Sequence, residues 1–213
     1  MKHKFLNQKG FTLIELLVVI TIIGILATLA PSAISNAITS ANKVQALSGA
    51  RNVGMALRQY AGDNDGAYPE GGTAVAAFNH LFPQAAGANG YIKDKKQFYV
   101  KGSAWTPKPV TGGDPLKLGA NENHWAYMQG LTSESPENWP LLFDGPKDES
   151  GTYSPLKSEK GGVWEGRVAI VVRVNGAASP EKLKDLRLQS DGQGNALSAS
   201  GDWLKGATYA APY

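Results

Sequence analysis

Residues 9–30 read KGFTLIELLVVITIIGILATLA, and this stretch decides how the chain is organised. Between Phe11 and Ala30 it holds one ionisable side chain, that of Glu15. A helix rises about 1.5 Å per residue, so these twenty residues span roughly 30 Å, which is close to the hydrocarbon thickness of a bilayer. The stretch therefore predicts a helix over residues 11–30 that is able to cross a membrane.

The charges on either side of the apolar stretch predict its orientation. Lys2, Lys4 and Lys9 precede it, and residues 31–42 carry no charged side chain. An excess of lysine on the N-terminal side predicts a cytoplasmic N-terminus and an exported remainder. Removing these three lysines from the 21 basic residues leaves 18, against 18 acidic residues. No basic surplus remains for phosphate contacts, so nucleic acid is not an expected partner.

Two simpler interpretations of the stretch compete with a specialised one. A cleavable secretory signal has an apolar region of about 7–15 residues before a small-residue cleavage site, whereas this run is longer and Ala30 is followed by Pro31. A plain membrane anchor explains the length and the charges but not Glu15. A carboxylate near the centre of a membrane helix costs roughly 2.5–3.5 kcal/mol, and less near the interface. That cost predicts a functional carboxylate with a charged partner.

The sequence KGFTLIE at residues 9–15, followed by LLVVI, resembles the processing motif of type IV pilins and type II secretion pseudopilins. In that family a prepilin peptidase cuts after the glycine, and the new N-terminal residue is N-methylated. The resemblance implies cleavage between Gly10 and Phe11 and methylation of Phe11. It also implies that Glu15 acts in assembly, by neutralising the α-amino group of a neighbouring subunit's first residue. A helix bend is implied at Pro31, one position earlier than in many members.

The same resemblance implies partners and a location. The expected partners are like subunits in a filament, the peptidase and methylase, the inner-membrane assembly platform with its ATPase, and the membrane itself. The protein would first be a single-pass inner-membrane protein with an exported head, and then part of a periplasmic or cell-surface filament. Both a type IV pilus and a type II secretion pseudopilus remain open. The alternative function is a membrane-anchored head with ligand-binding or enzymatic activity that uses the helix only as an anchor.

Beyond the apolar stretch, the sequence predicts a continuing helix and then a globular head. Apolar residues recur at three- and four-residue steps to about residue 61. The expected domains are a leader at 1–10, a spine helix at 11–61 and a head at 62–213. The expected fold is α+β and pilin-like, with the spine packed on an antiparallel sheet. The expected strands are 97–100, 124–128, 141–143 and 167–174, and the expected short helices are 73–82 and 179–186.

The head offers no recognisable catalytic or metal-binding pattern. The chain has no cysteine, and His3, His80 and His124 lack the spacing of a zinc-binding motif. No nucleophile or phosphate-loop motif is present, so neither an enzyme nor a cofactor is expected. Residues 63–66, DNDG, resemble the start of a calcium loop but lack its later ligands, so a turn is favoured. The five tryptophans could form a ligand platform, but core packing is favoured because they lie in different segments.

Overall fold

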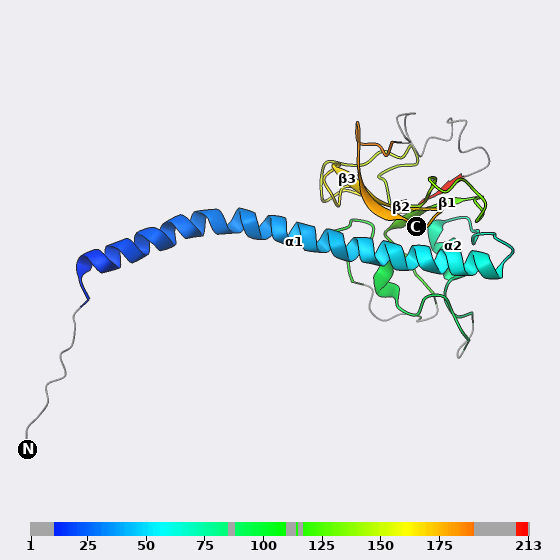
Figure 1. The fold of residues 1–213 in the computed structure, drawn as a ribbon, viewed down its shortest axis with the longest axis horizontal. Coiled ribbons are helices and arrows are strands. Elements are labelled where there is room, and N and C mark those ends of the chain that lie inside the picture. Colours follow the sequence, from blue (N-terminus) through cyan, green and yellow to red (C-terminus); the bar gives the residue numbers. More distant parts are fainter. Residues whose placement is uncertain (1–10, 85–87, 110–113, 115–116, 190–207, 213) are drawn as a thin grey trace, which may run out of the picture. The chain divides into compact units, whose positions relative to one another are not determined.

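The computed structural model describes residues 11–84, 88–109, 114, 117–189 and 208–212, without the side chains of residues 29–33, 208 and 209. The chain forms two compact units, Met1–Ala41 and Asn42–Tyr213. The first described element, α1 (Leu13–Asp63), begins in the first unit and ends in the second. Figure 1 shows this helix as the longest element of the chain. The predicted spine is therefore helical to its end, with the helix stopping two residues later than expected.

The first unit holds only the N-terminal part of α1 among its described elements. Its apolar side chains have no core to enter, and all those described from Phe11 to Leu26 are exposed. Within the described part of the chain, which leaves out the side chains of 29–33, no helix is long and apolar enough to span a membrane. The helix is continuous through Pro31.

The second unit is built on one antiparallel sheet, which confirms the expected α+β fold. Its strands are β1 (Trp125–Gln129), β2 (Pro140–Asp144), β3 (Val168–Arg173), β4 (Ala178–Lys182) and β5 (Thr208–Ala210). The order across the sheet is β4-β3-β2-β1-β5, with every neighbouring pair antiparallel. All five residues of β2 are buried. Because successive side chains of a strand point to opposite faces, both faces of the sheet are covered at β2.

The second half of α1 packs against this sheet through small residues. Its buried residues are Ala46, Ala50, Val53, Ala56, Leu57 and Ala61. A side chain at Gly54 would place its Cβ 2.7 Å from Val172 Cγ1, so only glycine lets the helix approach β3 this closely. Gly49 plays the same role beside the Gln97 carbonyl oxygen, 2.9 Å from an added Cβ. The two glycines lower helix propensity but allow close packing on the head.

Most of the predicted local elements of the head are present. Helix α2 (Ala74–Asn79) begins after Thr73, whose side chain accepts a hydrogen bond from the Ala76 amide as predicted for its cap. The strands expected at 124–128, 141–143 and 167–174 correspond to β1, β2 and β3. Residues 64–66 form a turn after α1, and Gly66 has a φ of 82°. The turn prediction for residues 63–66 is confirmed.

Two predicted elements are wrong. Residues 97–100 do not form a strand, because Asp94 caps a short 3-10 helix, η1 (Lys95–Phe98), by accepting a hydrogen bond from the Lys96 amide. Residues 179–186 do not form a helix, because Ala178–Lys182 is β4 and pairs with β3. Pro180 fits there because β4 is an edge strand, where a missing amide donor can face away from the sheet. Short β5 was not predicted.

The tryptophans that the structure describes pack in the core, as the sequence predicts. Trp105, Trp125 and Trp164 are buried, and Trp139 packs against the core while partly exposed. Trp203 lies outside the described residues. The four described tryptophans are therefore core residues and not an exposed platform.

Candidate functional site

The N-terminus of α1 is closed by a reciprocal pair of hydrogen bonds between Thr12 and Glu15. The Thr12 amide donates to Glu15 Oε2 at 2.8 Å, and the Glu15 amide donates to Thr12 Oγ1 at 3.3 Å. The Thr12 hydroxyl also donates to Oε2, at 2.6 Å. This is a capping box, in which a threonine before the helix and a glutamate three residues later satisfy each other's backbone amides. The spacing T-x-x-E at residues 12–15 is the sequence signal of this capping box, and it was missing from the predicted features above.

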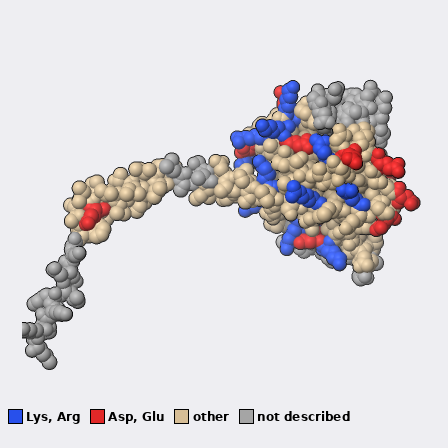
Figure 2. Space-filling view, viewed as in Figure 1, with Lys and Arg blue, Asp and Glu red and all other residues tan. Residues whose placement is uncertain are grey.

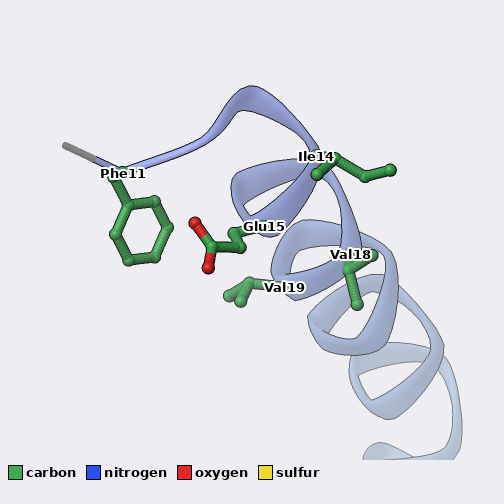
Figure 3. Close-up of a pocket in the computed structure, with 5 residues that line it drawn as sticks. All are labelled: Phe11, Ile14, Glu15, Val18 and Val19. Atoms are coloured by element: carbon green, nitrogen blue, oxygen red, sulfur yellow. The ribbon is translucent and has the colours of Figure 1, made fainter. Parts of the chain in front are cut away.

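Glu15 lines an open, largely apolar hollow of about 370 Å³ on the surface of the helix. Its walls are Phe11, Ile14, Val18 and Val19, and Figure 3 shows the carboxylate between the Phe11 ring and Val19. All three capping hydrogen bonds involve Oε2 or the backbone of Glu15. Within the described part of the chain, Oε1 accepts no hydrogen bond. One carboxylate oxygen is thus committed to the helix end, and the other is exposed at the helix surface.

The polar side chains of this helix segment satisfy one another or their own backbone. The Thr21 hydroxyl donates to the Leu17 carbonyl at 2.7 Å, and the Thr28 hydroxyl donates to the Ile25 carbonyl at 2.8 Å. Glu15 is the charged residue among the described residues 11–41, and Figure 2 shows the rest of their described surface without charged side chains. A helix with an apolar surface and internally bonded hydroxyls suits a setting without water.

Comparison with known proteins identifies this segment. A family model described as the prokaryotic N-terminal methylation motif matches residues 6–31. The chain carries the prepilin-type methylation motif. The match contains all four residues singled out from the sequence: Gly10, Phe11, Glu15 and Pro31. Comparison with curated proteins and with solved structures finds no match.

The structure places part of the prepilin motif. Gly10 lies outside the described residues, and the side chain of Pro31 does as well. Phe11 and Glu15 are brought together at the hollow, with Phe11 75% exposed. Phe11, where the predicted cut would create a new amine, is thus an exposed aromatic residue beside the exposed Glu15 carboxylate.

A second polar cluster, away from the prepilin motif, lies buried in the head. His124 Nε2 lies 2.5 Å from Asp144 Oδ1, and His124 Nδ1 lies 2.6 Å from Ser103 Oγ. Asp144 Oδ2 accepts hydrogen bonds from Trp164 Nε1 at 2.8 Å and from the Ile170 amide at 2.5 Å. Sequence reasoning missed this cluster because its members come from separate loops and strands with no common spacing.

The protonation of the cluster follows from matching donors to acceptors. A carboxylate oxygen only accepts, so a hydrogen on His124 Nε2 is the one that bonds to Asp144 Oδ1. Ser103 Oγ accepts the Trp105 amide at 3.1 Å and can donate its own hydrogen to His124 Nδ1. A neutral imidazole with its hydrogen on Nε2 therefore satisfies every member of the cluster.

A serine, histidine and aspartate chain is also the arrangement of many acyl-transfer nucleophiles. Here Ser103 is 3% exposed, and His124 and Asp144 are each 1% exposed. A substrate carbonyl has no route to a hydroxyl this deeply enclosed. The cluster acts in the structure, by tying the segment before β1, the end of β2 and the start of β3 together.

Neither cluster forms a metal site with the other described residues. Across the described residues, no group of three or more histidine or acidic side chains is placed to hold a metal ion. His80 ends α2, and its ring centroid lies 6.3 Å from that of Tyr60. The candidate site that matches the known motif is therefore the one at the start of α1.

Proposed function

We propose that this chain is a prepilin-type filament subunit, cut between Gly10 and Phe11, N-methylated on Phe11 and assembled through α1. The observation that carries the proposal is the position of Glu15, which bonds through Oε2 to Thr12 and stands among exposed apolar side chains about one helical turn from the predicted new N-terminus. Once these apolar side chains pack against lipid or another subunit, the carboxylate lies in apolar surroundings and needs a counter-ion. Cleavage supplies one, because it creates a positively charged amine on every subunit.

The pairing is best made between subunits. Each carboxylate already bonds to Thr12 of its own chain through Oε2, which leaves Oε1 for an incoming donor. Two opposite charges attract strongly in a medium of low dielectric constant, whereas either one alone is expensive to bury. An amine from a neighbouring copy would therefore set the stagger at which two apolar helices pack.

The same segment supports anchoring in the membrane before assembly, with residues 11–30 as the proposed span. Six consecutive residues from Val18 to Ile23 are β-branched, and such residues are weak helix formers in water. In lipid the helix is favoured over other conformations, because every backbone polar group must form its hydrogen bond within the segment and only a helix allows this. The bonded hydroxyls of Thr21 and Thr28 remove the remaining polar cost.

We propose a location and partners that follow from membrane insertion, processing and assembly. The chain would be inserted in the inner membrane with its head exported, processed by a prepilin peptidase, and passed by an assembly platform and its ATPase into a filament of like subunits. Both a type IV pilus and a type II secretion pseudopilus fit these features. Pro31 would bend the helix at the membrane exit, because proline removes one backbone hydrogen bond.

The test compares Glu15→Gln with wild type in cells that express the prepilin peptidase. Glutamine still accepts the Thr12 amide, so the cap survives, but the charge is lost. The buried amine then lacks its counter-ion, and breaking such a pair costs about 3–5 kcal/mol. We expect normal amounts in the inner membrane, an N-terminus at methylated Phe11 by mass spectrometry, and loss of the protein from sheared or cross-linked filaments.

Two outcomes would contradict the proposal. Unchanged filament incorporation of Glu15→Gln would show that the carboxylate does not hold subunits together. A wild-type N-terminus at Met1, or a cut after Ala30, would show that the motif is not processed as proposed. Gly10→Val serves as the matched processing control and should leave an uncut precursor, because a side chain blocks the close backbone approach that glycine allows.

A further inference from the structure

A cavity of about 280 Å³ lies in the second unit where α1 ends. Its walls come from four segments: the end of α1, the turn that follows, the loop between β1 and β2, and the turn between β3 and β4. The lining residues are Arg58, Ala61, Gly62, Gly66, Tyr68, Ser133, Glu137, Val174 and Asn175. This volume is just below the range of about 300–1,000 Å³ that is typical of sites for drug-sized molecules, so only a smaller ligand fits.

Backbone hydrogen bonds hold these walls together. The Gly66 amide donates to the Ala61 carbonyl at 2.8 Å, and the Ser133 amide donates to the Gly66 carbonyl at 2.8 Å. The Asn175 amide donates to the Glu137 carbonyl at 3.1 Å. The cavity is therefore formed by fixed main-chain segments and not by loosely packed side chains.

Tyr68 is the buried polar residue on the cavity wall. The residue is 4% exposed, and its hydroxyl makes no hydrogen bond to any described residue and keeps contact with solvent in the cavity. Burial raises the pKa of Tyr68, and the nearby Arg58 charge offsets this only in part, so the hydroxyl keeps its hydrogen and can donate.

Two opposite charges line the same cavity without meeting. Arg58 Nη1 donates to the Asn175 carbonyl at 2.6 Å, and the guanidinium packs on Gly176, where an added Cβ would clash with it. That contact fixes the side chain and leaves its other N–H groups available. Neither Arg58 nor Glu137 forms an ion pair with any described residue.

We propose that this cavity binds a small zwitterion of amino-acid or dipeptide size. A carboxylate would accept hydrogen bonds from Arg58 and Tyr68, which together match the planar, multiply accepting shape of that group. An ammonium group on the same molecule would face Glu137. A simple anion meets repulsion from Glu137, and a simple cation meets repulsion from Arg58, so the lining selects for both charges at once.

The test uses the full-length chain in detergent micelles, with tyrosine rings labelled for NMR and the Tyr68 signal assigned from Tyr68→Phe. The probe is glycylglycine, with acetyl-glycylglycine and glycylglycinamide as analogues that each lack one charge. We expect a saturable shift of the Tyr68 signal with glycylglycine. Each blocked analogue should bind about tenfold to a hundredfold more weakly, as for the loss of one charged hydrogen bond.

Three variants separate binding from folding. Tyr68→Phe should leave the melting temperature unchanged, because the lost hydroxyl has no protein partner, while the affinity measured by calorimetry falls. Glu137→Gln should weaken the zwitterion but strengthen acetyl-glycylglycine. Glu134→Gln, an exposed neighbour outside the lining, is the matched control and should change neither affinity.

The absence of saturable binding by glycylglycine would overturn the proposal. Equal affinity for all three compounds, or an effect of Glu134→Gln as large as that of Glu137→Gln, would also overturn it. The filament function does not depend on this cavity, so its own test with Glu15→Gln is unaffected by either result.

Discussion

At the scale of single residues, Oε2 of Glu15 has a capping role and we propose an assembly role for Oε1. Oε2 closes the helix end through Thr12, and Oε1 is left for a partner. The sequence indicated the second role through the cost of a carboxylate in an apolar run. The T-x-x-E spacing of residues 12–15 indicates the capping role as well.

The cap itself can be tested apart from the charge. Thr12→Ala removes the hydroxyl that accepts the Glu15 amide and costs about 1 kcal/mol of helix stability. We expect filament yield to fall, but less than with Glu15→Gln, because the counter-ion remains. Thr12→Ser keeps the cap and should behave as wild type. Equal loss of filaments with Thr12→Ala and Glu15→Gln would mean that the cap, and not the charge, limits assembly.

Asp144 gives a second prediction at this scale, this time for stability. Asp144→Asn replaces one accepting oxygen by an NH2 group, which can only donate. In one orientation this group faces His124 Nε2, and in the other it faces the N–H groups of Trp164 and Ile170. Leaving a buried group of this kind unmatched costs about 3 kcal/mol or more. The melting temperature should fall steeply, whereas Ser103→Ala should cost about 1–2 kcal/mol. An unchanged melting temperature of Asp144→Asn would show that the asparagine leaves no buried donor without an acceptor.

At the scale of elements, sequence patterns predicted what is local and missed what depends on distant partners. The spine, α2 and the three central strands follow from apolar spacing, capping residues and β-branched runs. Strand β4 could not be recognised, because its sequence ASPEK is typical of a helix start and only pairing with β3 makes it extended. The His124 cluster is likewise built by the sheet, which brings residues 103, 124 and 144 together.

The ion pair that fastens η1 to the segment before β1 gives a pH prediction. Glu122 is partly buried, which by itself raises its pKa, but the Lys95 ammonium at 2.8 Å and the Gly119 amide outweigh burial and lower the pKa below the ordinary 4.5. A lowered pKa in the folded state stabilises the fold above pH 4.5, and this contribution is lost as the pH falls through the folded-state pKa.

The measurement is thermal unfolding of wild type and Glu122→Gln across this range. Wild type should be more stable at neutral pH, and the difference between the two should shrink as the pH is lowered beneath 4.5. A difference that stays constant with pH would show that the pair contributes through packing and not through charge. Glu149→Gln, an exposed change with no ion pair among the described residues, provides the control.

At the scale of the whole molecule, the division of α1 between two units has a consequence for where the head begins. The compact unit starts at Asn42, whereas the sequence places the start of the head at residue 62. Six buried residues of α1, from Ala46 to Ala61, belong to the core of that unit. The sequence showed an amphipathic spine but could not show how closely Gly54 lets it approach Val172.

We therefore expect a fragment of residues 42–213 to unfold cooperatively and a fragment of residues 62–213 to fail to do so. Burial of Val53 and Leu57 alone contributes about 1.5–3 kcal/mol each, against a total stability of roughly 5–15 kcal/mol for a domain. Without the helix, the sheet face around Val172 would meet water, and aggregation is the expected result. Circular dichroism during heating and the dispersion of NMR signals would distinguish the two fragments. Equal melting temperatures would show that the head needs no part of the spine, and that α1 serves the filament alone.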